Sequence, residues 1–182
     1  MNLLIGVTGS VAAVKLTELV EMILKLYPNT NIRVVATQQA RVFLKNQTIH
    51  NMYQDEAEWT EWTERGDPVL HIELRKWADV FLIAPLSANS LAKLAQGLCD
   101  NLLTSIVRAW DVEKRLIVAP AMNTFMWDNP FTQKHLGVIT EVYRAEVIPP
   151  KPDYILACGD RGAGAMAAVN DIVNHIFPSD RS

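Results

Sequence analysis

Five short runs that are apolar along their whole length, separated by helical patterns, constrain the fold of this chain more than any other feature. Strands of this kind are typical of a parallel sheet that is covered by helices on both faces. The runs are predicted strands at Leu3–Val7, Ile32–Ala36, Val80–Ala84, Leu116–Ala119 and Glu146–Ile148. The sequence therefore predicts an α/β fold built on a parallel sheet.

The segments between these runs carry helix signals. Leu16, Leu19 and Ile23 recur at helical spacing, and Asn129 precedes a proline at the position that favours a helix start. Helices are predicted at about 11–26, at 40–45, after Ser87, at 100–110, after Asn129 and at 167–177. Pro85 and Pro120 are expected to end their strands, and residues from about 50 to 67 are expected to form an irregular surface excursion.

Length and composition limit the function classes. The chain has 182 residues, which fits one domain over 1–182, and its net charge of −3 gives no reason to expect nucleic acid or an anionic membrane as a partner. No apolar run reaches the ~18 residues of a membrane span, and Leu3–Val7 is expected to be a strand and not a signal peptide. We therefore expect a partner that is neither nucleic acid nor membrane.

The cysteines and histidines do not predict a metal site. Cys99 and Cys158 lie far apart without a CxxC pair, and the histidines lack a metal-ligand spacing. No disulfide framework is indicated either, so the reducing cytoplasm is the expected location. Cys99 is interpreted as a structural residue.

Polar turns follow the predicted strands at Thr8–Ser10, Thr37–Gln39, Pro85–Asn89 and Pro120–Asn123. Parallel sheets bind ligands at the carboxyl ends of their strands. The first turn, GVTGSVAA, suits an anion, but it is neither GxGxxG nor a P-loop, and no acid follows the second strand to hold a dinucleotide ribose. A ligand with one phosphate and a polyol, such as FMN, fits better. Ser10, Ser87 and Asn89 are also ordinary helix caps, and the residues alone leave both readings open.

Five long motifs occur in order along the chain: GVTGSVAA, GDPVLHIELRKWADVFLIAPLSANS, GLCDNLLTSIVRAWD, PAMNTFMW and ACGDRGAGAM. With His71 and Cys158, they make the chain resemble the homo-oligomeric flavin-containing cysteine decarboxylase family, over nearly its whole length. The resemblance implies a doubly wound, flavodoxin-like or Rossmann-like sheet in three α/β/α layers. It also implies a homotrimer whose active sites lie at subunit interfaces.

The resemblance further implies FMN as the cofactor. Phe43 would stack on the isoalloxazine, although a core aromatic on a short helix is the ordinary alternative. The residues implied to approach the FMN are Gly9, Ser10, Val11, Thr37, Gln38, Gln39, Phe43, Ser87, Ala88, Asn89, Ser90 and Ala121.

Three residues are implied to be catalytic. His71 would be the active-site base or carboxylate partner, and its ordinary alternative is a half-exposed histidine of a strand or loop. Asn123 would grip the substrate carboxylate or amide, and its alternative is a cap. Cys158 would be an acid, and its ordinary alternative is a small buried hydrophobe. Glycine-rich loop composition follows it, so a flexible lid at about 149–166 is the functional expectation. The implied substrate-binding residues are Asn123, Met122, Ala157 and Met166.

Acidic residues between positions 55 and 64 are interpreted as a solvated face and not as a paired-carboxylate site. These residues are Asp55, Glu56, Glu58, Glu61 and Glu64.

The reaction implied by the resemblance is conversion of 4'-phosphopantothenoylcysteine to 4'-phosphopantetheine in coenzyme A biosynthesis. Flavin oxidation of the cysteine side chain to a thioaldehyde places a C=S group β to the carboxylate, so CO2 can leave. The enethiol is then reduced again, with Cys158 supplying a proton from a thiol that is protonated at neutral pH.

Three alternatives rank lower. A regulatory subunit that inhibits a protein phosphatase is disfavoured, because no acidic tail follows Phe177 in this sequence. A decarboxylase of peptides that end in cysteine is disfavoured by Cys158, and a flavin prenyltransferase by the PAMN motif.

Overall fold

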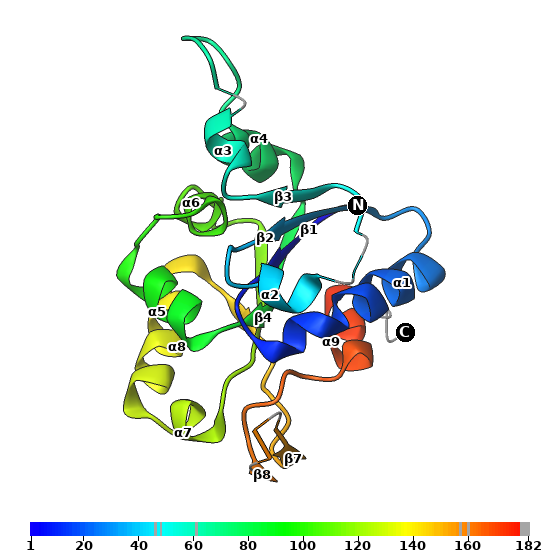
Figure 1. The fold of residues 1–182 in the computed structure, drawn as a ribbon, viewed down its shortest axis with the longest axis vertical. Coiled ribbons are helices and arrows are strands. Elements are labelled where there is room, and N and C mark those ends of the chain that lie inside the picture. The colour runs from blue at the N-terminus through cyan, green and yellow to red at the C-terminus, as the bar shows by residue number, and fades with distance from the viewer. Residues whose placement is uncertain (46, 48, 61, 157, 160, 179–182) are drawn as a thin grey trace.

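The fold is a three-layer α/β/α sandwich around a parallel sheet, which confirms the predicted fold class. The computed structural model describes residues 1–45, 47, 49–60, 62–156, 158–159 and 161–178. Within these residues the sheet has six strands in the order β3-β2-β1-β4-β5-β6, all parallel (Figure 1). The strands are β1 (Asn2–Val7), β2 (Asn31–Ala36), β3 (Met52–Gln54), β4 (Val80–Leu86), β5 (Arg115–Pro120) and β6 (Glu146–Val147).

Helices cover both faces of the sheet because strand side chains alternate between two apolar clusters. Leu3, Ile5 and Val7 of β1 belong to one cluster, whereas Leu4 belongs to the other. The first cluster is covered by η1 (Val11–Lys15), α1 (Leu16–Leu26), α2 (Arg41–Leu44) and α9 (Val169–Ile176). The second is covered by α4 (Leu70–Trp77), α5 (Ala88–Gln96), α6 (Leu102–Arg108) and α8 (Pro130–Tyr143).

Helix starts follow the caps that the sequence carries. Ser87, Asn101 and Asn129 are the N-caps of α5, α6 and α8, and Asn101 forms a capping box with Thr104. The helix predicted at 11–26 is one continuous segment that begins with a turn of 3₁₀ helix, η1, before α1.

Two expectations about the strands are wrong. Residues 50–67 are not simply irregular, because β3 pairs in parallel with β2 and α3 (Ala57–Thr60) follows it. β3 is three residues long and lies at the sheet edge, so it lacks the long apolar run that marks the central strands. Pro85 does not end its strand, because β4 continues to Leu86 across a register shift between Ile83 and Leu86.

The predicted lid at 149–166 contains a small antiparallel hairpin. Strand β7 (Tyr154–Ile155) pairs with β8 (Arg161–Gly162), and this hairpin projects from the bottom of the molecule in Figure 1. Arg161 donates two hydrogen bonds of 2.8 Å to the carboxylate of Asp153, which ties the two arms together. The described residues of this segment therefore include a hairpin that stands outside the central sheet.

Candidate active site

A cavity of about 610 Å³ opens at the carboxyl ends of β1, β2, β4 and β5. This is the edge at which parallel α/β sheets bind ligands. Lid residues close one side of the cavity, Cys158 among them. The predicted site residues that line it are Gly9, Ser10, Val11, Gln39, Phe43, Ser87, Ala88, Asn89, Ser90, Ala121, Met122, Asn123, Cys158 and Met166.

Thr8 connects the turn that follows β1 with the turn that follows β4. The sequence does not reveal this connection. The fully buried hydroxyl of Thr8 donates to Pro85 O at 2.8 Å and accepts from Ser87 N at 2.7 Å. Thr8 N also donates to Pro85 O at 3.2 Å. Two turns that are 77 residues apart in sequence are thus held in one arrangement.

The serines of the cavity are both caps and lining residues, so the two readings of the sequence are compatible. Ser10 Oγ accepts from Ala12 N at 3.4 Å, and Ser87 Oγ accepts from Ser90 N at 3.3 Å. Both residues also line the cavity. Two helix N-termini, those of η1 and α5, therefore face a common space in which backbone N–H groups can hold an anion.

The second turn contains a buried hydroxyl that suits a ligand. Thr37 is 2% exposed, and its Oγ1 makes no hydrogen bond to the described residues. Buried hydroxyls are rarely left without a partner in proteins, and a bound polar ligand would supply one. Of the three predicted residues in this turn, Gln39 lines the cavity, whereas Thr37 and Gln38 are not among its lining residues. A Cβ on Gly9 would lie 2.6 Å from Gln39 Cβ, so only glycine allows the first and second turns to approach this closely.

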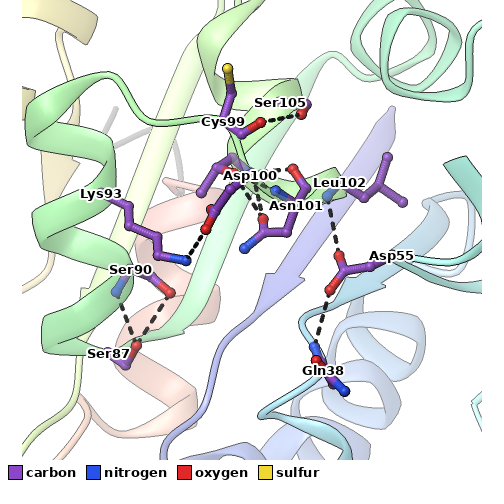
Figure 2. Close-up of polar contacts among 11 residues, drawn as sticks. Gln38, Asp55, Ser87, Ser90, Lys93, Cys99, Asp100, Asn101, Leu102 and Ser105 are labelled. Carbon is purple, nitrogen blue, oxygen red and sulfur yellow. Dashed lines mark hydrogen bonds and ion pairs between the residues drawn. The ribbon is translucent and has the colours of Figure 1, made fainter.

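Asp55 links the turn that follows β2 to the start of helix α6 by hydrogen bonds. Its carboxylate accepts from Gln38 N at 3.3 Å and from Leu102 N at 3.1 Å, as Figure 2 shows. Burial raises the pKa of Asp55 above its ordinary value, although the two N–H donors act in the opposite direction. Asp55 is therefore part of the framework of the cavity, and its interpretation as a solvated face residue is wrong.

Asn123 and Cys158 meet at the cavity. Asn123 is the N-cap of α7 (Thr124–Trp127), where its Oδ1 accepts from Phe125 N at 2.9 Å. This bond turns Nδ2 toward the lid, and Nδ2 donates to Cys158 Sγ at 3.2 Å. The amide and the thiol of two distant motifs thus share one site.

The lid is anchored to the segment that carries Asn123. Met122 N donates to Gly164 O at 2.9 Å, and Thr124 Oγ1 donates to Ala163 O at 2.8 Å. Gly164 has φ +123°, and a Cβ there would lie 2.3 Å from Met122 O. Glycine is required at this position because both its backbone conformation and its surroundings exclude a side chain.

His71 lies away from this cavity within one chain. It is the second residue of α4 and not part of a strand or loop, and it is absent from the cavity lining. Its Nδ1 contacts Glu58 Oε1, and its backbone N donates to Glu58 Oε2 at 3.0 Å. Glu58 is therefore not a solvated acid, because its side chain is only 9% exposed.

The remaining predicted residues occupy varied positions. Phe43 is half-buried and packs against the core as well as lining the cavity, and Ala157 lies outside the described residues. Cys99 is exposed, so its interpretation as a buried structural residue is wrong. In the described ranges, no cluster of His, Cys, Asp or Glu side chains suits a metal ion, and no helix combines the length and apolarity needed to cross a bilayer.

A doubly wound parallel sheet with two anion-binding turns and a buried hydroxyl at its carboxyl edge defines a class of mononucleotide-binding protein. Comparison with known proteins specifies that class. Residues 1–179 match the flavoprotein family, and the chain belongs to it.

Relatives of known name are close in sequence. The chain is 48% identical over 173 residues to phosphopantothenoylcysteine decarboxylase of Mus musculus, covering 94% of this chain and 83% of the mouse protein. It is 47% identical over 180 residues to a probable thymidylate synthase of Schizosaccharomyces pombe, covering 96% of this chain but only 28% of that much longer protein.

Solved structures agree with these relatives. A mutant PPC decarboxylase complexed with pantothenoylaminoethenethiol superimposes with a TM-score of 0.89 at 48% identity, covering 96% of this chain and 95% of that one. The FMN-binding protein AtHal3 has a TM-score of 0.85 at 49% identity, covering 96% and 94%. The chain is thus a flavin-containing decarboxylase whose cofactor is FMN, as the motifs predicted.

Proposed function

We propose that this enzyme decarboxylates 4'-phosphopantothenoylcysteine to 4'-phosphopantetheine, a step of coenzyme A biosynthesis. The observation that carries the proposal is the contact of 3.2 Å between Asn123 Nδ2 and Cys158 Sγ at the cavity. In the proposed reaction this contact would bring a carboxylate-binding amide beside a proton-donating thiol at the substrate's cysteine.

FMN would be held by the turns at 8–11, 37–39 and 87–90, with Thr37 Oγ1 as a hydrogen-bonding group. When bound, it supplies a two-electron acceptor and donor for the carbon–sulfur bond of the substrate. Bound substrate would take the place of the thiol as partner of Asn123 Nδ2. The apolar side chains of Met122, Met126 and Met166 line the same cavity and would exclude water from the reacting carboxylate.

Cys158 would complete the reaction by giving its Sγ proton to the substrate carbon. Thiol chemistry of this kind needs a reduced cysteine, which a reducing cytoplasm maintains. In a Cys158→Ser variant, we expect CO2 release to continue while an oxidised enethiol accumulates. The measurement is mass spectrometry of the products, and normal aminothiol product from the variant would remove Cys158 from the mechanism.

His71 would act on the site of a neighbouring subunit. In Figure 1, helix α4 lies at the top of the molecule, whereas α7 and the lid hairpin lie at the bottom. One chain therefore does not bring His71 to Asn123, and we propose a homotrimer in which a neighbour supplies it. A His71→Asn variant is expected to keep its flavin colour and release almost no CO2.

Mixed oligomers test this arrangement directly. Subunits carrying His71→Asn and subunits carrying Cys158→Ser should restore normal aminothiol product when they are unfolded and reassembled together, because some sites then receive both intact residues. The oligomeric state is measured by light scattering. A monomer in solution, or mixed oligomers without restored product, would contradict the shared site.

The substrate class is tested by competition. Purified enzyme with FMN is assayed for CO2 release from 4'-phosphopantothenoylcysteine and from a peptide that ends in cysteine. We expect a preference for the former of at least about 100-fold in kcat/KM, equivalent to ~2.7 kcal/mol. Equal rates would favour the peptide decarboxylase alternative.

A further inference from the structure

The contact between Glu58 and His71 uses both oxygens of the carboxylate. Oε1 contacts the ring at Nδ1, and Oε2 accepts from the backbone N of His71 at 3.0 Å. The Glu58 side chain is 9% exposed and that of His71 is 26% exposed, so solvent competes little for the carboxylate. Exposed ion pairs on a protein surface contribute little to stability. This contact differs from them because the carboxylate is largely buried and binds the same residue twice.

This contact determines which ring nitrogen carries a proton. A carboxylate in its ionised form only accepts hydrogen bonds, so the contact favours the tautomer in which His71 Nδ1 carries the proton. In the neutral ring, Nε2 then holds a lone pair, and in the described residues no hydrogen bond involves it. The ring is oriented to accept a proton, or to donate one after protonation, at Nε2.

The position of His71 makes such a partner necessary. His71 is the second residue of α4, where the helix dipole disfavours a positive charge. Glu58 offsets that field, and it also satisfies a backbone N–H that has no acceptor within the helix. Glu58 therefore contacts both the ring and the backbone of His71 at the start of α4.

The segment that carries Glu58 is itself fixed to the flavin-binding edge. Three residues before Glu58, the carboxylate of Asp55 holds Gln38 N and Leu102 N (Figure 2), and Ala57 packs against the second apolar cluster. The turn proposed to approach FMN and the ring of His71 are thus positioned by one short stretch of chain.

We propose that Glu58 is a positioning residue, which holds His71 with Nδ1 protonated so that Nε2 faces the substrate. This proposal rests on the proposed function for the role of His71, but the orientation of the ring is tested without any assay of activity. Carboxylate partners that orient a histidine are worth roughly 10- to 100-fold or more in rate.

The orientation is measured by NMR of the FMN-loaded enzyme labelled with ¹⁵N-histidine, with the His71 signals assigned by their loss in His71→Asn. We expect the Nδ1–H tautomer, or the doubly protonated ring, in the wild-type enzyme. A neutral Nε2–H tautomer would overturn the proposal whether or not the enzyme is active, and this measurement needs no variant of Glu58.

The role is measured with Glu58→Gln, whose amide can donate to Nδ1 and so removes the preference for the Nδ1–H tautomer. We expect kcat for CO2 release to fall roughly 10- to 100-fold, while KM, FMN content and melting temperature stay close to those of the wild type. The variant Glu58→Asp, which keeps a carboxylate, should recover part of the rate. The matched control is Glu56→Gln, whose carboxylate is exposed and pairs with Arg41 at 3.0 Å; it should leave kcat unchanged.

The outcomes separate this proposal from the proposed function. An unchanged kcat in Glu58→Gln, or losses of FMN and melting temperature that account for the whole fall, would overturn a positioning role. A wild-type enzyme that releases no CO2 from 4'-phosphopantothenoylcysteine would instead overturn the proposed function, and the tautomer of His71 would still decide the orientation.

Discussion

The floor of the cavity and its lid differ in how much of each is buried and in how each is held in place. The floor, formed by the turns at 8–10, 37–39, 87–90 and 121–123, is buried at its centre and held by hydrogen bonds between turns, such as those of Thr8. In the lid at 149–166, strand β7 is exposed, with Ile155 at 68%, and Arg161 of β8 is exposed as well. The lid is attached to the floor and to α7 by hydrogen bonds from Met122 N to Gly164 O, from Thr124 Oγ1 to Ala163 O and from Asn123 Nδ2 to Cys158 Sγ.

This difference suggests a division of labour. A buried floor held by hydrogen bonds keeps a cofactor in place, whereas a segment with an exposed hairpin can open and close at lower cost. We therefore expect floor variants to lose flavin and stability together, and lid variants to change the product while the flavin and the fold persist.

Thr8→Val is the strongest test of the floor. The substitution leaves the buried Ser87 N–H without its acceptor, so the free energy of unfolding should fall by about 2–4 kcal/mol and FMN content should fall with it. Thermal unfolding and the absorption spectrum measure the two quantities. Thr8→Ser, which keeps the hydroxyl, is the control, and a variant that unfolds early but retains all its flavin would break the link between them.

Gly164→Ala is the corresponding test of the lid. A methyl group there meets Met122 O at 2.3 Å, so the lid should detach from the floor and not distort it. We expect normal FMN content, a small change in melting temperature and a fall of tenfold or more in aminothiol product, with enethiol in its place. The control is Gly66→Ala, which has a comparable φ of +113° but nothing within 4 Å. A loss of flavin in Gly164→Ala would show that lid and floor are not independent.

Thr124→Val removes a single attachment of the lid. Loss of the hydrogen bond to Ala163 O should destabilise the closed lid relative to the open lid by about 1 kcal/mol. This corresponds to roughly fivefold less aminothiol product relative to enethiol. Thr124→Ser keeps the hydroxyl and should behave as the wild type. If Thr124→Val and Thr124→Ser give the same ratio of aminothiol to enethiol, the hydroxyl of Thr124 does not hold the lid.

Glu146, the first residue of β6, provides the smallest expected effect and lies outside both regions. Its carboxylate receives two hydrogen bonds of 2.8 Å from Arg115, and His175 Nε2 lies 2.8 Å from it. Arg115, and to a lesser degree His175, lower the pKa of Glu146 from its ordinary value of 4.5.

A lowered pKa in the folded state fixes the sign of the pH dependence. The stabilising contribution of Glu146 is fully present above pH 4.5 and is lost as pH falls through the lowered folded-state pKa. Urea unfolding between about pH 6 and pH 3 should show this loss, and Glu146→Gln should lessen the slope. An identical slope in the variant would mean that other carboxyl groups are responsible.

Much of the floor could be predicted from sequence because its signals are local. Continuous apolar runs such as Leu3–Val7 marked the central strands, and Ser87 and Asn129 marked helix starts within one or two residues. The edge strand β3 was missed because three residues with one pairing partner leave no periodic pattern.

The environments of the acidic residues between positions 55 and 64 could not be predicted from the sequence. Asp55 and Glu58 were interpreted as solvated because neighbouring acids usually are, yet one binds two backbone N–H groups and the other binds His71. Their partners lie at least 13 residues away in sequence, so no local signal distinguishes them from Glu56, which is exposed.

By itself, the sequence determined the class of fold, the helix caps and the motifs that carry Asn123 and Cys158, because each depends on residues that are close together in the chain. The flavin chemistry came from the resemblance of those motifs to a known family. Only the tertiary structure decided that Thr8 joins two turns, that Glu58 contacts His71, and that His71 is not among the residues that line the cavity of its own chain. These are contacts between distant segments, and their geometry exists only once the sheet and both of its helical layers have assembled.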